Sequence, residues 1–285
     1  MTAKLIDGKQ IAAEIRGEVA KRVGALSERG ITPGLATVLV GDDPASRVYV
    51  NSKRKMCAEV GIKAWDHDLE ASTPQDQLLQ LLEELGSDPA VHGILVQLPL
   101  PAHIDEELVL EAVPPHKDAD GFHPCNLGRV LQGTHLVAPA TPAGIQELLI
   151  RANIETSGAE VVVAGRSNIV GKPIAAMLFQ KAAGANATVT VCHTSTRDLA
   201  EHTKRADIVI AAIGRAGAIT APMLKPGAVV IDVGINRTED GLKGDVDTEA
   251  AMEVASAITP VPGGVGPMTI AMLLSNTVTL AERFG

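Results

Sequence analysis

The chain has 285 residues, a formal net charge of -9 and a hydrophobic fraction of 46%. This length allows one large domain or two moderate ones, and abundant Ala, Val, Ile and Leu suit buried parallel strands covered by helices. The negative charge, with only one Trp, one Tyr and three Phe, argues against nucleic acid as a partner, because such a surface repels phosphates and offers few rings for stacking.

The cysteine pattern and the lack of long apolar runs exclude further classes of protein. Cys57, Cys125 and Cys192 are an odd number without a CxxC pair, so neither a disulfide framework nor a zinc site is indicated and no metal is expected. No stretch approaches the roughly 18 apolar residues of a membrane span, and the first ten residues are too polar for a signal peptide. We therefore expect a cytoplasmic protein with no membrane partner.

Strand-like apolar runs alternate with amphipathic segments through the first half of the chain, a rhythm typical of parallel sheets. The predicted elements are a helix at 6–29, a strand at 35–40, a helix at 44–60, a strand at 62–69, a helix at 74–85, a strand at 91–98 and a helix at 105–112. Between 114 and 142 the pattern lapses into proline, glycine and histidine, which predicts irregular structure.

The second half restarts the same rhythm, which predicts a second doubly wound sheet. Its predicted elements are a helix at 142–152, strands at 160–164, 188–191, 207–212 and 228–233, and a closing helix at 267–283. We place a domain boundary near residue 139, so that residues 1–138, completed by a C-terminal helix at 267–285, form one domain and residues 139–266 form a Rossmann-like domain. The predicted fold class is α/β, with two domains each built on a mainly parallel sheet flanked by helices.

The helix at 44–60 carries an unusual set of polar side chains. Tyr49, Lys53, Met56 and Cys57 recur at spacings of three or four, so they share one helical face, and Lys53 lies inside an apolar stripe. Ser46 lies a turn before the only tyrosine, so three polar tips can converge. The alternative is that the Lys53 stem covers the core while its ammonium reaches water.

Two further polar positions follow in the first half. Gln97 lies near the carboxyl end of the strand at 91–98, where open α/β sheets bind ligands, although it can equally tie down the following loop. The loop 117–122 offers the carboxylates of Asp118 and Asp120. An Asp-Gly pair such as Asp120-Gly121 is by itself typical of a turn.

The strand at 160–164 leads through Gly165-Arg166-Ser167 into a helix, a layout that aims backbone amides at a phosphate. Its glycines, six residues apart, do not form GxGxxG, and a tight packing turn is the alternative. No carboxylate follows the strand at 188–191, whereas a site for NAD commonly has one there. Arg166 and the hydroxyls of residues 194–196 can hold a 2'-phosphate, which favours NADP over NAD.

Several blocks together resemble one family. They are Val38 to Ile62, Val96-Gln97-Leu98-Pro99-Leu100-Pro101, Lys117 to Phe122, Gly165-Arg166-Ser167 and Pro260 to Thr269. In this order they resemble the bifunctional methylenetetrahydrofolate dehydrogenase/cyclohydrolase family over nearly the whole chain. The resemblance implies NADP-dependent oxidation of 5,10-methylenetetrahydrofolate to the methenyl form, followed by hydrolysis to 10-formyltetrahydrofolate.

The resemblance also implies a homodimer of two-domain subunits in which folate and nicotinamide meet in an interdomain cleft. It assigns catalysis to Tyr49 and Lys53, with Gln97 assisting. The implied substrate-binding residues are Ser46, Tyr49, Asp120, Pro262, Gly263, Gly264 and Gly266, and the implied NADP-binding residues are Gly165, Arg166, Ser167, Thr194 and Ile235. The loop at 262–266 lacks a P-loop lysine, so its glycines suit close approach of a flat ligand to bare backbone.

Three alternatives stand beside this interpretation. Tyr49 and Lys53 also form the YxxxK of short-chain dehydrogenases, but in that family the nucleotide glycines precede YxxxK, whereas here Gly165 lies far downstream. A nucleotide-binding scaffold without catalysis is the second alternative. The third is a dehydrogenase that lacks effective cyclohydrolase activity.

Overall fold

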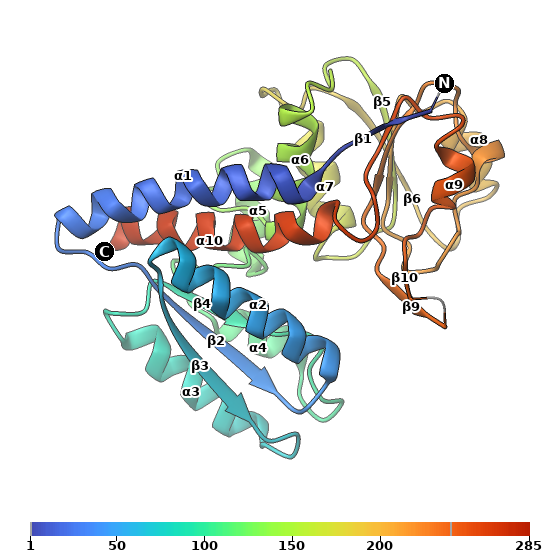
Figure 1. Ribbon diagram of the computed structural model, residues 1–285. Helices are drawn as coiled ribbons and strands as arrows, with labels where there is room; N and C mark the ends of the chain where they lie inside the picture. The colour runs from blue at the N-terminus through green and yellow to red at the C-terminus, as the bar shows by residue number, and fades with distance from the viewer. Residues whose placement is uncertain (1, 240) are drawn as a thin grey trace. The chain divides into compact units, whose positions relative to one another are not determined.

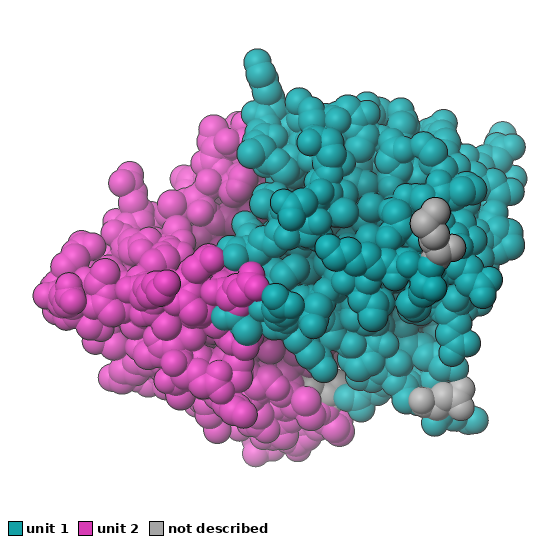
Figure 2. All heavy atoms as spheres, turned by 45° about the horizontal axis from the view of Figure 1, so that its top comes forward, with its two compact units in different colours: residues 1–13, 141–269 teal, residues 14–140, 270–285 magenta. Residues whose placement is uncertain are grey.

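The computed structural model describes residues 2–239 and 241–285. Contacts divide the chain into two compact units: residues 1–13 and 141–269 belong to unit 1, and residues 14–140 and 270–285 belong to unit 2. Figure 2 shows unit 1 in teal and unit 2 in magenta. Each unit contains a parallel sheet with flanking helices, which confirms the predicted fold class.

Unit 2 is built on a three-stranded parallel sheet in the order β3-β2-β4. The central strand β2 (Gly34–Val40) is buried along its whole length, because β3 (Lys63–Leu69) pairs with one edge and β4 (Gly93–Val96) with the other. The helices of this unit include α2 (Pro44–Val60), α3 (Gln75–Ser87), α4 (Glu106–Ala112) and α5 (Pro124–Gln132). Leu78 and Leu82 of α3 pack with Ile94 of β4 in its apolar core.

The local signals in the sequence fix both ends of α2. The Asp43 carboxylate accepts a hydrogen bond from the Ser46 amide at 2.7 Å, and Pro44 occupies the first turn, as capping chemistry requires. Gly61 ends the helix with a φ of 83°, a left-handed conformation that glycine adopts without steric cost. The position of α2 decides which side chains face the sheet.

The chain's long first and last helices run side by side within unit 2 (Figure 1). These helices are α1 (Gly8–Glu28) and α10 (Val265–Phe284), and the unit boundary falls within each. The Arg22 guanidinium of α1 donates to the Glu282 carboxylate at 2.7 Å and to the Thr279 hydroxyl at 2.7 Å. The Asn276 amide of α10 donates to two backbone carbonyls of unit 2, at 2.9 Å each. Residues 270–285 are therefore an integral part of unit 2.

Unit 1 is built on a six-stranded sheet in the order β1-β11-β8-β7-β5-β6, in which every paired strand is parallel. Its strands are β1 (Lys4–Leu5), β5 (Glu160–Ala164), β6 (Thr188–Cys192), β7 (Ile208–Ala211), β8 (Val229–Asp232) and β11 (Ala257–Ile258). The chain runs from β5 to β6 on one side and returns to β7 on the other. A topological switch point therefore lies between β5 and β7, where such sheets bind ligands at the carboxyl edge.

Shorter elements complete unit 1. They are α6 (Ala140–Arg151, whose first residue belongs to unit 2), α7 (Gly171–Leu178), α8 (Leu199–Thr203), the single turn η1 (Ala221–Met223), the hairpin strands β9 (Asn236–Thr238) and β10 (Gly241–Lys243), and α9 (Thr248–Ala251). The apolar core on one side of the sheet includes Val162, Val209 and Val230 from three neighbouring strands. None of the helices in the described part of the chain is long and apolar enough to cross a bilayer.

The structure corrects the expectation of irregular chain between 114 and 142, because α5 forms at 124–132. The His123 ring nitrogen Nδ1 accepts a hydrogen bond from the Cys125 amide at 3.0 Å, Pro124 starts the helix, and Gly133 ends it with a φ of 72°. These are ordinary helix boundary signals. Pro124 and Gly133, which had indicated irregular chain, instead mark the start and the end of a short helix.

Candidate active site

The structure brings Lys53 of α2 against Gln97, the residue that follows β4. Only 7% of Lys53 is exposed, and its Nζ donates to the Gln97 Oε1 at 3.0 Å. The Gln97 Nε2 donates to the Leu98 carbonyl at 2.7 Å, so the oxygen end of this amide faces the lysine. Gln97 therefore both ties down its loop and orients the amine.

Burial shifts the protonation of this amine. The pKa of Lys53 is lowered chiefly because burial penalises the charged ammonium, while the negative charge of Asp120 opposes the shift. Burial likewise raises the pKa of Asp120 to about 6, with Lys53 pulling it down. A lysine whose pKa is lowered can release and accept a proton during catalysis.

The other polar side chains of α2 lie where the helical spacing places them. Ser46 is buried and Tyr49 is half-buried, on the face that carries Lys53. Cys57 is buried one turn after Lys53, and burial raises the pKa of its thiol to about 12. A thiol with so high a pKa is unreactive, so Cys57 serves packing.

The two carboxylates of the loop at 117–122 have different surroundings, which residue spacing alone did not distinguish. Asp118 is buried and accepts hydrogen bonds from the amides of Gly121, Phe122 and His123 and from the side chain of Asn126, at 2.8 to 3.2 Å. Asp118 therefore shapes the loop, and Asp120 is the carboxylate whose charge acts on Lys53. Lys117 also has a structural role, because its Nζ donates to the Asp88 carbonyl at 2.7 Å.

In unit 1 the turn after β5 is closely packed. Gly165 has a φ of 145°, and a Cβ there would overlap the carbonyl oxygen of Ala212, the residue after β7. A Cβ on Gly171 would in turn overlap the backbone of Gly165. The Ser167 hydroxyl accepts from the Val170 amide at 3.1 Å. These contacts place the start of α7 against the turn, at the carboxyl edge of the sheet where open α/β sheets bind ligands.

Arg166 and Thr194 lie at the same edge of the sheet. The paired strands β5 and β6 align Ala164 with Cys192, and Arg166 and Thr194 are each two residues beyond that pair, both exposed. Ile235, which follows β8, is 47% exposed. The predicted cofactor residues therefore follow β5, β6 and β8 at their carboxyl ends, whereas the Thr196 hydroxyl accepts from the His193 amide at 2.8 Å and holds its own turn.

Pro262, Gly263 and Gly264 form the turn that precedes α10, Gly266 lies in the first turn of that helix, and all four belong to unit 1. Gly263 has a φ of 112°, and a Cβ on Gly264 would press on Thr259 and the Pro260 carbonyl. A Cβ on Gly266 would meet only the end of the Ile235 side chain, at 3.8 Å. Backbone packing thus accounts for Gly263 and Gly264, and contact of this loop with folate stays a prediction.

Sequence reasoning missed two buried carboxylates of unit 1. Asp232 is 1% exposed and Asp245 is fully buried. Burial raises the pKa of Asp232 to about 6, while hydrogen bonds from the amides of Asp245, Val246 and Gly234 lower it. The available signal was an aspartate that directly follows the apolar run of β8.

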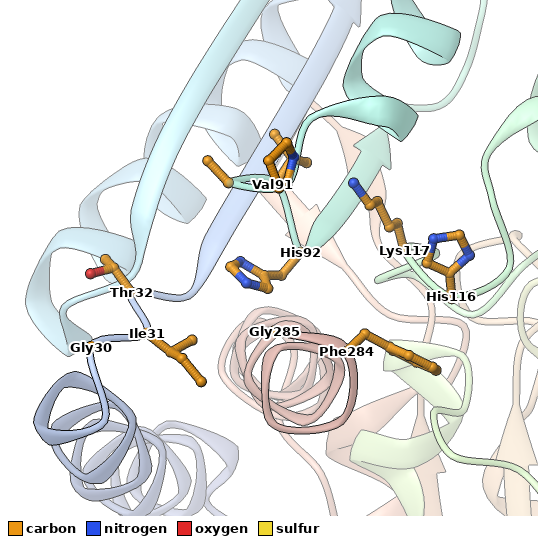
Figure 3. Close-up of a pocket in the computed structure, with 11 residues that line it drawn as sticks. Gly30, Ile31, Thr32, Val91, His92, His116, Lys117, Phe284 and Gly285 are labelled. Carbon is orange, nitrogen blue, oxygen red and sulfur yellow. The ribbon is translucent and has the colours of Figure 1, made fainter.

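A cavity of about 480 Å³ lies elsewhere in unit 2. Figure 3 shows His92, His116 and Lys117 around it, with Phe284 of α10. His92 precedes β4 and Gln97 follows it, so this cavity lies at the amino ends of the strands, away from the edge that binds ligands in open α/β sheets. The His92 Nδ1 already accepts from the Gly34 amide at 3.1 Å and the Lys117 Nζ donates to the Asp88 carbonyl, so His92 and Lys117 serve the fold.

A doubly wound sheet with a glycine turn and an exposed arginine at its carboxyl edge, in a chain that also buries a lysine beside an amide, defines an enzyme that uses a dinucleotide and acid–base chemistry. Residues 139–284 match the tetrahydrofolate dehydrogenase/cyclohydrolase NAD(P)-binding domain, and residues 6–120 match the catalytic domain of that family. The chain belongs to the tetrahydrofolate dehydrogenase/cyclohydrolase family.

Individual relatives agree with this assignment. The bifunctional protein FolD of Geotalea uraniireducens is 58% identical over 282 residues, which cover 99% of each chain. A crystal structure of the bifunctional FolD enzyme from Campylobacter jejuni is 48% identical, with a TM-score of 0.94 and 99% of both chains covered. The Trypanosoma brucei enzyme, solved with NADP and an inhibitor, is 39% identical, with a TM-score of 0.93 and coverage of 99% of this chain and 98% of that chain.

The family resemblance, the folate chemistry and the nicotinamide cofactor predicted from the motifs are confirmed by these comparisons. The family decides against the short-chain dehydrogenase interpretation of Tyr49 and Lys53. The protein is therefore an enzyme of folate one-carbon chemistry with a dehydrogenase and a cyclohydrolase activity. The roles of its individual residues stay predictions.

Proposed function

We propose that the protein oxidises 5,10-methylenetetrahydrofolate to 5,10-methenyltetrahydrofolate with NADP and hydrolyses this product to 10-formyltetrahydrofolate. The observation that carries the proposal is the buried Lys53 amine, which is held by Gln97 at 3.0 Å and has a lowered pKa. A group of this kind is required in the second reaction, where water is the nucleophile.

The two steps place different demands on the lysine. Oxidation transfers a hydride from the bridging carbon to the nicotinamide ring and leaves a delocalised cation, so no proton needs to leave. Hydrolysis adds water to that cation, and a proton must leave the water before the ring nitrogen departs. Neutral Lys53 accepts this proton, Gln97 holds the amine in place, and Tyr49 orients the substrate and water.

Asp120 and Ser46 supply substrate recognition in unit 2. An ionised carboxylate accepts two parallel hydrogen bonds from an aminopyrimidine edge such as that of a pterin. This role for Asp120 is supported by the use of Asp118 as the carboxylate that holds the loop. The charge of Asp120 also acts on the amine of Lys53, which links substrate binding to the acid–base group.

Unit 1 supplies the cofactor site. Gly165 and Ser167 would line the pyrophosphate, because the backbone of the turn between β5 and α7 can approach it closely, with Ile235 beside the nicotinamide half. Arg166 and Thr194 would hold the 2'-phosphate, for which a guanidinium is the preferred partner. The exposed Arg166, together with the absence of a carboxylate at residues 193–197 after β6, fits NADP better than NAD.

A spectrophotometric assay tests this function. The purified protein is given 5,10-methylenetetrahydrofolate with NADP or with NAD, and reduced nicotinamide and methenyl product are followed separately. We expect reduction of NADP without lasting accumulation of the methenyl form. Failure to reduce either cofactor would refute the proposal, and accumulation of the methenyl form would instead support a dehydrogenase without effective cyclohydrolase activity.

We also propose that the protein is a cytoplasmic homodimer, as the family resemblance implies. Sedimentation equilibrium of the purified protein measures its assembly, and a monomer at micromolar concentration would contradict it. Fractionation of cells between cytosol and membranes measures its location.

A further inference from the structure

Two buried carboxylates of unit 1 accept hydrogen bonds from backbone amides of several loops. Asp245, which follows the β9–β10 hairpin (Figure 1), accepts from the amides of Ile213, Gly214 and Arg215 at 2.5, 2.8 and 3.0 Å and from the Asn236 side chain at 2.9 Å. Asp232, at the end of β8, accepts from the amides of Gly234, Asp245 and Val246 at 2.9 to 3.0 Å.

The hydrogen bonds of Asp245 fix the backbone that follows β7. A carboxylate has about four acceptor positions, and four N–H donors meet Asp245. Three of them come from successive residues, 213–215, which follow Ala212. Ala212 is the residue whose carbonyl packs against Gly165, so Asp245 holds the segment that faces the proposed phosphate turn across the switch point.

Asp232 fixes both Asp245 and the segment after β8. The Asp232 Oδ1 accepts from the Asp245 amide at 2.9 Å and from the Gly234 amide at 3.0 Å, and Gly234 directly precedes Ile235. A Cβ on Gly234 would overlap the Asp245 carboxylate. The segments after β7 and β8 are thereby joined into one hydrogen-bonded network at the carboxyl edge of the sheet.

This geometry excludes a cation site, because N–H groups occupy the acceptor positions of Asp245. The strand ladder does not need the hydrogen bonds of Asp232 and Asp245, because these bonds go to segments that follow the strands. Buried charges without such partners are strongly unfavourable. Two buried carboxylates at this edge are therefore best explained by the backbone conformation that they impose.

We propose that Asp245, held in place by Asp232, is a positioning residue for the nicotinamide cofactor: it presets the segments after β7 and β8 in the conformation that binds the dinucleotide. The proposal rests on the proposed function, in which unit 1 binds NADP. A loop that is ordered before binding does not lose its conformational entropy on binding, so loss of the carboxylate weakens NADP affinity more than any step that needs no NADP.

The test uses two substitutions in the full chain. Asp245→Ala removes all four hydrogen bonds, and we expect the dissociation constant for NADP, measured by calorimetry, to rise about 100-fold. Asp245→Asn keeps an oxygen for the Ile213 and Gly214 amides, and we expect a rise of only about 10-fold. Hydrolysis of 5,10-methenyltetrahydrofolate, supplied without NADP, should keep its turnover in both variants.

The matched control is Asp247→Ala. Asp247 is an exposed aspartate two residues away that caps α9 through the Ala250 amide, so its loss removes a carboxylate from the same segment without touching residues 213–215. We expect unchanged NADP affinity in this variant, with a small loss of thermal stability.

Each outcome is decisive. Unchanged NADP affinity in Asp245→Asn, an equal loss in Asp247→Ala, or a parallel loss of NADP affinity and cyclohydrolase turnover would overturn the proposal. If Asp245→Ala does not fold, Asp245→Asn alone carries the test. Failure of the proposed function is distinguishable, because it would appear as no NADP reduction by the unsubstituted protein.

Discussion

Replacement of Lys53 by methionine separates the two activities. Methionine fills nearly the same space as the lysine stem but lacks the amine, so the Gln97 Oε1 loses the donor that lies at 3.0 Å. An unsatisfied buried acceptor costs about 1–3 kcal/mol, but removal of an amine whose charged form is penalised by burial offsets part of this. We therefore expect the free energy of unfolding to change by less than about 2 kcal/mol.

The effect on hydrolysis should be far larger. A well-placed acid–base group contributes about 100-fold to 10,000-fold, which corresponds to about 3–5 kcal/mol of activation free energy. Cyclohydrolase turnover of Lys53→Met should fall by this factor, whereas dehydrogenase turnover should remain measurable because hydride transfer releases no proton.

The assay measures each step with its own substrate. Methenyltetrahydrofolate alone reports hydrolysis, and methylenetetrahydrofolate with NADP reports oxidation, with methenyl product accumulating in the variant. Lys55→Met is the matched control, because Lys55 lies on the same helix and is exposed. Equal loss of both activities in Lys53→Met, without accumulation of the methenyl product, would show that Lys53 only positions the substrate.

Three further substitutions test the remaining assignments. Arg166→Ala should raise KM for NADP about 10-fold or more and leave KM for NAD unchanged, because a charge-assisted hydrogen bond to phosphate is lost; equal effects on both would exclude the 2'-phosphate. Asp120→Ala should raise the folate dissociation constant. In the unsubstituted protein that constant should rise as pH falls through about 6, the raised pKa of Asp120, and a pH dependence that persists in Asp120→Ala would refute this origin. The folded protein binds this proton more tightly than the unfolded chain, so protonation of Asp120 stabilises the fold as pH falls from about 6 towards 4. Thermal melts over this pH range should therefore show that weaker folate binding is not caused by unfolding. Gly165→Ala should lower stability by about 1–3 kcal/mol in denaturant titrations, because its Cβ would overlap the Ala212 carbonyl; an unchanged midpoint would refute the packing role.

Elements with complete local signals were predictable. The sequence places α2 at its observed bounds because Asp43, Pro44 and Gly61 mark its ends. The helix α5 was missed although it has similar marks, because only nine residues separate its cap from Gly133. Strand β1 could not be predicted, since two residues carry no periodicity and its hydrogen bonds come from β11, far along the chain.

The same limit of local sequence signals applies to individual side chains of the site. Helical spacing was enough to place Lys53 in an apolar stripe, and strand topology was enough to place Gln97 at the right edge. Spacing could not separate Asp118 from Asp120, because the difference lies in which amides turn back to meet each carboxylate. Asp245 was missed for the same reason, since its partners after β7 lie about thirty residues earlier in the chain.

Both units are assembled from segments that are distant in the chain, and this has a consequence for folding during synthesis. Residues 14–140 leave the ribosome long before residues 270–285, which supply Asn276 and the partners of Arg22 to the same unit. Contacts of such long sequence separation slow folding, and incomplete domains expose apolar surface. We expect the nascent chain to remain dependent on chaperones until its final helix is made, and a chain shortened before residue 270 to be cleared by proteases.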